Sequence, residues 1–149
     1  MFLGQYRHNI DDKGRLTIPA RFRELLAEGA YVLRGFDQNL MVLTPPAFDA
    51  FAHRANQMSI TDPKARELKR LLFSTAERVE ADKSGRILLP QYLREMVGLE
   101  GEVVLSGAGD HFEIWQPKAW SPQMDLLQDP EASTQRFTEL ELSSERPDG

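Results

Sequence analysis

Residues 11–19 read Asp-Asp-Lys-Gly-Arg-Leu-Thr-Ile-Pro, and residues 82–90 repeat this pattern as Asp-Lys-Ser-Gly-Arg-Ile-Leu-Leu-Pro. At a constant offset of 71 residues, the shared positions are Asp11/Asp82, Gly14/Gly85, Arg15/Arg86 and Pro19/Pro90. An aspartate can bond its own backbone and a glycine accepts positive φ, so each stretch predicts a tight turn. The alternating apolar residues then predict a strand with one buried face, and the proline suits the first turn of a helix.

The similarity between this first repeat and second repeat extends well beyond the motif. Further matches, at offsets of 71 and 72, are Arg23/Arg94, Glu24/Glu95, residues 31–35 with 103–107, and residues 40–45 with 112–117. Each repeat therefore predicts the order strand, turn, strand, short helix, strand, turn, strand. A single repeat is too small to bury a stable core by itself, so we expect the two to share one core.

The chain resembles the MraZ family of bacterial transcriptional regulators, in the SpoVT-AbrB superfamily. The resemblance rests on the duplicated Gly-Arg-x-x-x-Pro after an acidic turn and on the start Met1-Phe2-Leu3-Gly4, and it covers roughly residues 1–120. It implies an α+β fold in which two tandem swapped-hairpin, AbrB-like β-units share one β-barrel, with short flanking helices. It also implies a ring-shaped homo-oligomer that binds repeated double-stranded DNA elements ahead of the division and cell-wall gene cluster.

We expect four segments along the chain. They are a SpoVT-AbrB-like unit over residues 5–47, connecting helices over 48–75, a second such unit over 76–119, and an acidic C-terminal helix and tail over 120–149. In the last segment, Ser121-Pro122 predicts the start of a short helix. Residues 143–149 offer almost nothing apolar to bury, so we expect them to be disordered. Whether residues 124–142 dock on a neighbouring chain is left open.

The charge of the chain is unevenly distributed. It has 23 acidic and 18 basic residues, for a formal net charge of −5 at pH 7. Residues 119–149 hold seven of the acids and two of the bases, so this segment carries the whole net charge. The rest of the chain is neutral, and DNA binding would need a local basic patch.

Arg15 and Arg86 each follow the glycine of a predicted turn. A guanidinium there can make a bidentate contact with guanine O6 and N7, or it can hold a phosphate. The alternative is an internal ion pair with Asp11 or Asp82 that stiffens the turn, and the two roles can coexist. The predicted DNA-binding residues are Arg15, Arg86, Lys13, Arg7 and Lys83, and the predicted turn residues are Asp11, Gly14, Asp82 and Gly85.

Other basic residues have two interpretations each. Arg21 and Arg23 help make the first repeat more basic than the second by one charge, so we expect it to contribute more to DNA affinity. The alternative is ordinary solvated helix surface. The basic run in residues 64–70 could contact phosphates, or it could form a solvated helix face with an ion pair to Glu67.

The sequence shows no pattern of an enzyme, a metal site or a cofactor site. Asp11-Asp12 lie in a predicted exposed turn, which does not suit a catalytic carboxylate pair. His8, His53 and His111 lack the spacing of metal ligands, and cysteine is absent. No phosphate-binding loop, dinucleotide fingerprint or nucleophile elbow occurs. There is no apolar run of roughly 18 residues and no signal peptide. We therefore expect a cytoplasmic, nucleoid-associated protein with no cofactor, small-molecule substrate or membrane partner.

Together with the resemblance, these observations predict a sequence-selective DNA-binding regulator that acts as a homo-oligomer and is not an enzyme. The alternative is a protein-interaction module, antitoxin-like or an assembly factor, that uses the same fold without DNA. An enzyme on a related small barrel is a third candidate, but no residue set in the sequence suggests the convergent polar pocket it would need.

Overall fold

The computed structural model describes residues 1–140. The disorder expected for residues 143–149 lies outside the described residues. The chain divides into two compact units, Met1–Pro117 and a C-terminal unit that starts at Lys118. The candidate functional residues all belong to the first unit.

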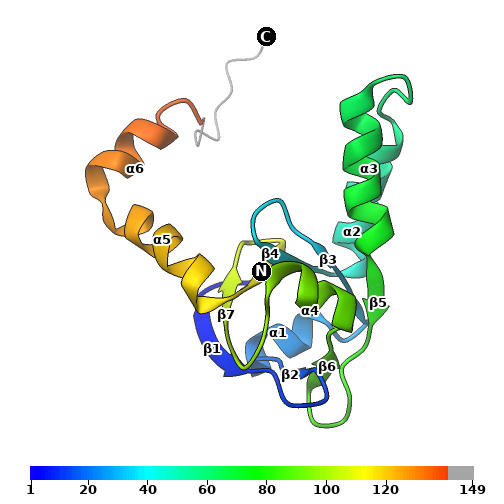
Figure 1. The fold of residues 1–149 in the computed structure, drawn as a ribbon, viewed down its shortest axis with the longest axis vertical. Helices are drawn as coiled ribbons and strands as arrows, with labels where there is room; N and C mark the ends of the chain where they lie inside the picture. The colour runs from blue at the N-terminus through cyan, green and yellow to red at the C-terminus, as the bar shows by residue number, and fades with distance from the viewer. Residues whose placement is uncertain (141–149) are drawn as a thin grey trace. The chain divides into compact units, whose positions relative to one another are not determined.

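Pairs of strands are separated by one or two helices along the described residues (Figure 1). The strands are β1 (Gln5–Asn9), β2 (Arg15–Thr17), β3 (Ala30–Arg34), β4 (Asn39–Leu43), β5 (Glu77–Val79), β6 (Arg86–Leu88), β7 (Glu102–Gly107) and β8 (His111–Trp115). The helices are α1 (Ala20–Leu25), α2 (Pro45–Asn56), α3 (Pro63–Thr75), α4 (Gln91–Val97), α5 (Pro117–Gln128) and α6 (Pro130–Phe137). The predicted α+β class is confirmed.

The largest sheet joins strands from both repeats. It is antiparallel, with the order β1-β7-β8-β4-β3-β5. The first strand of each repeat pairs with the other repeat, because β1 pairs with β7 and β5 pairs with β3. At the centre of the sheet, Met41 lies opposite Glu113, its own equivalent at the offset of 72. The repeats are therefore related by an approximate twofold axis.

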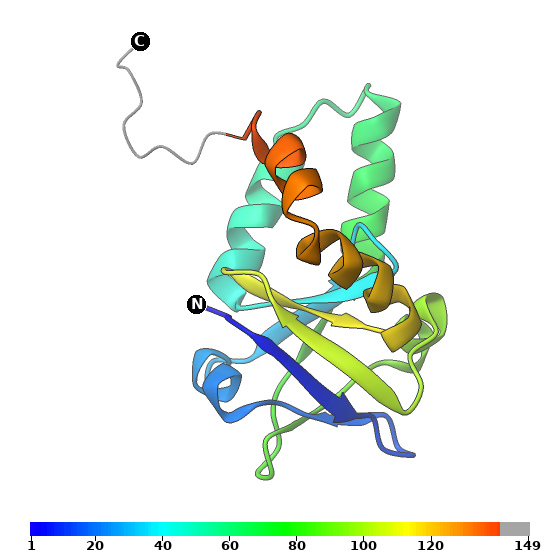
Figure 2. The same ribbon diagram turned by 90° about the vertical axis from the view of Figure 1, so that its left-hand side faces the viewer.

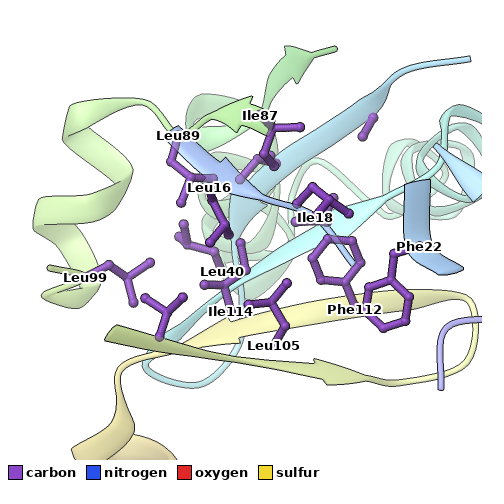
Figure 3. Packing of buried hydrophobic residues seen from close by; sticks show 14 of the residues in the cluster. Leu16, Ile18, Phe22, Leu40, Ile87, Leu89, Leu99, Leu105, Phe112 and Ile114 are labelled. Atoms are coloured by element: carbon purple, nitrogen blue, oxygen red, sulfur yellow. The ribbon is translucent and has the colours of Figure 1, made fainter. Parts of the chain in front are cut away.

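The two motif strands pair with each other to form a second, smaller sheet. β2 and β6 run antiparallel, with Leu16 opposite Ile87, again its own equivalent in the other repeat. The alternation predicted from the sequence is present, since Leu16, Ile18, Ile87 and Leu89 are fully buried. Figure 3 shows these side chains meeting in one cluster with Phe112 and other core residues.

A second apolar cluster joins the α2–α3 hairpin to the large sheet. It contains Leu33, Met41 and Leu43 from β3 and β4, together with Ala55 from α2 and Leu72 from α3. In Figures 1 and 2 this hairpin projects from the side of the large sheet opposite the small β2–β6 sheet. The hairpin therefore forms a separate layer over β3 and β4.

The start of α5 differs from the sequence prediction. The helix begins at Pro117, not at Ser121-Pro122, and Pro122 lies inside it. Pro117 aligns with Pro45, where α2 begins in the first repeat. The same proline start signal therefore operates in both repeats, since a proline in the first helical turn loses no intrahelical hydrogen bond.

Candidate functional site

The first turn is organised by the carboxylate of Asp11. Its Oδ1 accepts hydrogen bonds from the backbone N–H groups of Lys13 (3.0 Å) and Arg15 (2.8 Å). Its Oδ2 accepts a charged hydrogen bond of 2.7 Å from Nε of Arg15. The backbone N–H of Arg15, assisted by its guanidinium, lowers the pKa of Asp11 from its usual value. The turn is therefore held by the ionised form of this side chain.

The second turn repeats this arrangement around Asp82. Its carboxylate accepts from the backbone N–H groups of Ser84 (2.9 Å) and Arg86 (3.0 Å) and from Nε of Arg86 (2.9 Å). The backbone N–H of Arg86 is again the main cause of a lowered pKa for Asp82. The internal ion pair offered as the alternative role of the two arginines is thus confirmed in both repeats.

The ion pairs leave part of each guanidinium available. The side chains of Arg15 and Arg86 are each 31% exposed. Each uses Nε to bind its aspartate, and within residues 1–140 the terminal Nη atoms of both arginines make no hydrogen bond to the protein. A fixed guanidinium with open Nη atoms can donate two parallel hydrogen bonds to a base edge or to a phosphate.

Both arginines lie on one face of the small sheet. Arg15 lies opposite Leu88, and Arg86 lies opposite Thr17. Leu16 and Ile87 occupy the intervening positions, and their side chains are buried in the core. Because side chains alternate along a strand, the arginines are on the face directed away from the core.

Backbone hydrogen bonds fix each turn to the other repeat. The carbonyl of Gly14 accepts from the N–H of Leu89, and the carbonyl of Gly85 accepts from the N–H of Ile18, both at 2.9 Å. The β1–β2 and β5–β6 turns emerge on the same side of the first unit in Figure 1. The two turns therefore form one interlocked structure that presents two equivalent arginines.

Arg23 and Arg94 also link the two turns. The Nε of Arg23 donates to the carbonyl of Ile18 at 2.8 Å, and the Nε of Arg94 donates to the carbonyl of Leu89 at 3.0 Å. Each guanidinium lies against the turn glycine of the other repeat, Arg23 at Gly85 and Arg94 at Gly14. This positioning role was not predicted from the sequence, although both arginines recur at the offset of 71 residues.

The remaining predicted DNA-binding residues differ in their surroundings. Lys13 and Lys83 are exposed in the two turns, and no ion pair is formed by either side chain within residues 1–140. Arg7 instead pairs with Glu102 across the β1–β7 ladder, with Nη1 2.5 Å from Oε1. The two lysines are thus the better placed of these three cations to receive a phosphate.

No group of three or more histidine, cysteine, aspartate or glutamate side chains within residues 1–140 is placed to hold a metal ion. None of the helices described is both long enough and apolar enough to cross a membrane.

Comparison with known proteins matches this chain to one family in two tandem parts. The profile of the family described as "MraZ protein, putative antitoxin-like" matches residues 1–71 and again residues 72–140. The boundary between the two matches lies between the two turn motifs, so each match contains one of them.

Similar curated proteins cover most of the chain. A protein of Roseiflexus castenholzii named "Transcriptional regulator MraZ" is 44% identical over 142 residues, which are 94% of this chain and 99% of the relative. A protein of the same name from Herpetosiphon aurantiacus is 45% identical over 129 residues, or 87% of this chain and 90% of the relative. Another, from Dictyoglomus thermophilum, is 45% identical over 120 residues, covering 80% and 82% of the two chains.

Proposed function

The chain belongs to the MraZ family, and we propose that it is a transcription regulator that binds double-stranded DNA sequence-selectively through its two arginine-bearing turns. The name of the curated relatives supports transcription regulation. The proposal of DNA as the partner rests on one observation, which is that Arg15 and Arg86 are fixed on the same outward face with their Nη atoms open.

The chemistry of the turns suits base recognition. An arginine whose Nε is held by an aspartate loses little further side-chain entropy when it binds, and its Nη atoms can contact guanine O6 and N7. Lys13 and Lys83, on the same turns, would bind the flanking phosphates and set the position on the duplex. Arg7 would contribute less, because Glu102 already neutralises it.

The exchange of strands between repeats supports the finer description of the fold. β2 pairs with β6, β1 with β7 and β3 with β5, as expected for two swapped hairpins that share one barrel. We propose units over residues 5–47 and 76–119, with connecting helices over 48–75 and an acidic segment over 120–149.

A homo-oligomeric ring would supply the affinity that one subunit lacks. A neutral subunit with a few basic turn residues should bind DNA weakly, whereas several subunits on successive repeats of a promoter gain from a high effective concentration. By family resemblance, the target would be repeated elements ahead of the division and cell-wall gene cluster. The regulator would then act in the cytoplasm, in association with the nucleoid.

A mobility-shift titration with the DNA upstream of the chain's own gene tests this function. Arg15→Ala and Arg86→Ala should each weaken DNA binding by about 1–3 kcal/mol, which is roughly 5- to 150-fold in affinity. Arg54→Ala, which removes an exposed arginine from α2, is the matched control and should bind like the parent protein. A larger loss for Arg15→Ala would support the greater contribution expected of the first repeat, and equal losses would reject it.

Failure of the parent protein to shift any promoter fragment would overturn the DNA proposal. That result would favour the alternative of a protein-interaction module on the same fold, in keeping with the antitoxin-like description of the family. Light scattering on the same samples gives the oligomer mass.

A further inference from the structure

An open apolar groove lies beside α3, away from the two turns. It has a volume of about 500 Å³ and is lined by Phe36 of the β3–β4 hairpin, Leu68 and Leu71 of α3, and Met96 of α4. Phe36 is 58% exposed and Met96 is 44% exposed. Apolar side chains this exposed and this close together are typical of a binding surface.

Hydrogen bonds between its walls hold the groove open. The side-chain amide of Gln38 donates to the carbonyl of Met96 at 3.2 Å and so ties the β3–β4 hairpin to α4. The hydroxyl of Tyr92 on α4 donates to the carbonyl of Thr75 at 2.9 Å and so ties α4 to the end of α3. The ring of Phe36 also packs edge-on to Phe51, with their centroids 6.2 Å apart. The groove is therefore preformed.

The helix beside the groove is basic. α3 carries Lys64, Arg66, Lys69 and Arg70 against a single acid, Glu67, for a net charge of +3. The ion pair considered for Glu67 is not formed, because none of these five side chains makes an ion pair within residues 1–140. Of these residues, Lys64, Glu67 and Arg70 line the groove, so its apolar floor is bordered by a rim with a net charge of +1.

The C-terminal unit of the chain has the complementary character. Phe137 at the end of α6 is 48% exposed and Leu140 is 63% exposed. A backbone hydrogen bond of 3.0 Å from Leu140 to Phe137 keeps these two residues on one turn. Glu131 and Glu139 flank them and Arg136 precedes Phe137, so residues 130–140 carry a net charge of −1. An acidic turn with two apolar side chains is what the groove would accept.

We propose that the α3 groove of one subunit receives residues 130–140 of a second copy of this chain. Phe137 and Leu140 enter the apolar floor, and the flanking glutamates face the bases of α3. The inference deepens the proposed homo-oligomer and rests on it. Because groove and arm are different surfaces of one chain, the contact is heterologous, and such contacts close into rings when the rotation permits.

DNA is a poorer occupant of this groove than an acidic protein arm. A phosphate backbone could neutralise α3, but it offers nothing to bury Phe36 and Met96. In Figure 1 the α2–α3 hairpin also lies on the opposite side of the large sheet from the turns that carry Arg15 and Arg86. A duplex bound at the turns would leave the groove available for assembly.

The natural absence of cysteine permits a direct test. Full-length chains carrying Met96→Cys and chains carrying Phe137→Cys, distinguished by a tag, are mixed without DNA and oxidised. We expect a disulfide-linked dimer of the two different chains as the main product on a non-reducing gel. The matched control replaces Met96→Cys with Glu24→Cys, an exposed position on α1, and should give at least tenfold less of the mixed dimer.

Three results would overturn the inference. They are failure of the mixed dimer to form, an equal yield from the Glu24→Cys control, and capture of the arm by its own chain. The last would appear as a monomeric intrachain disulfide in the double variant, where we expect interchain species. The cross-linking is measured without DNA, so the two proposals can fail separately. If the mixed dimer forms but the protein does not bind DNA, the proposed DNA-binding function is overturned and the groove contact is not.

A charge variant separates the arm from DNA as the occupant. Lys64→Ala combined with Arg70→Ala, the two basic residues that line the groove, should lower the yield of the mixed dimer severalfold. Loss of DNA affinity with an unchanged yield would instead identify α3 as a DNA surface and overturn the inference.

Discussion

The guanidinium of Arg94 in the second repeat lies directly against Gly14 in the first. A Cβ atom built on Gly14 would lie 2.7 Å from Nη2 of Arg94, which is closer than real Cβ contacts allow. Gly14 also has a φ of +85°, a conformation that favours glycine. The glycine of the motif is therefore required twice, once for the turn and once for the packing of the other repeat's arginine.

We expect Gly14→Ala and Gly85→Ala to destabilise the fold. The positive φ alone should cost about 1–3 kcal/mol, and displacement of Arg94 or Arg23 should add to that loss. Gly101→Ala is the matched control, because Gly101 has a φ of +66° but nothing within 4 Å of an added Cβ. Denaturant unfolding of the three variants measures the difference. A Gly101→Ala loss as large as that of Gly14→Ala would show that the arginine contact contributes nothing.

The lowered pKa of Asp11 predicts a pH-dependent contribution to stability. A carboxyl group whose pKa is lowered by folding stabilises the folded state above its unfolded pKa of 3.8, and this stability is lost as the pH falls through the folded pKa. Asp11→Asn should therefore lower the free energy of unfolding at about pH 7, and the difference from the parent should close towards about pH 2.

The control for this prediction is the neighbouring residue. Asp12→Asn removes the same charge from the same turn, but the Asp12 side chain makes no hydrogen bond within residues 1–140. It should leave the unfolding curve nearly unchanged. A gap between Asp11→Asn and the parent that stays constant over the whole pH range would contradict the ion-pair explanation.

Local chemistry explains why much of this site could be predicted from sequence. The acidic turn, the short strand and the helix after the proline each depend on residues close in the chain, so the spacing Asp-x-x-Gly-Arg is informative. The repetition at the offset of 71 also indicated that both motifs have the same geometry, and Asp11 and Asp82 make matching hydrogen bonds.

The contacts between repeats could not be predicted in this way. That Arg94 packs on Gly14, and that Glu102 neutralises Arg7, depends on which strands exchange partners in the folded sheet. The sequence does not indicate which residues of the two repeats are in contact. An arginine on an amphipathic helix therefore looked like solvated surface, although Arg23 holds the turn at Gly85.

His111 predicts a second pH effect, of opposite sign. Its Nδ1 lies 2.7 Å from Asp110, and its Nε2 lies 3.6 Å from Glu113. Glu113, followed by Asp110, raises the pKa of His111 above 6.5 despite partial burial. A raised histidine pKa gives stability that is fully present below the unfolded pKa and is lost as the pH rises through the folded pKa. His111→Gln should therefore destabilise the protein more at about pH 5 than at about pH 9.

Thermal or denaturant unfolding at the two pH values checks this prediction. His53→Gln is the control, because His53 is exposed on α2 and, within residues 1–140, its ring bonds only Gln57, at 3.1 Å. If the loss for His111→Gln were larger at the higher pH, the protonated histidine would not be the stabilising form.

If the turn lysines contact phosphates and the turn arginines contact bases, their replacement should cause two different defects in DNA binding. Each phosphate contact adds about 0.9 to the slope of log affinity against log salt, so Lys13→Ala and Lys83→Ala should flatten this slope and weaken all sequences alike. Arg15→Ala and Arg86→Ala should mainly reduce the preference for the operator over shuffled DNA, because base contacts carry specificity. Titrations of both DNAs at several salt concentrations measure the two effects, with Lys118→Ala, an exposed lysine on α5, as the charge-matched control. A salt response as flat for the parent as for the lysine variants would exclude phosphate contacts at the turns, and with them the positioning role of Lys13 and Lys83.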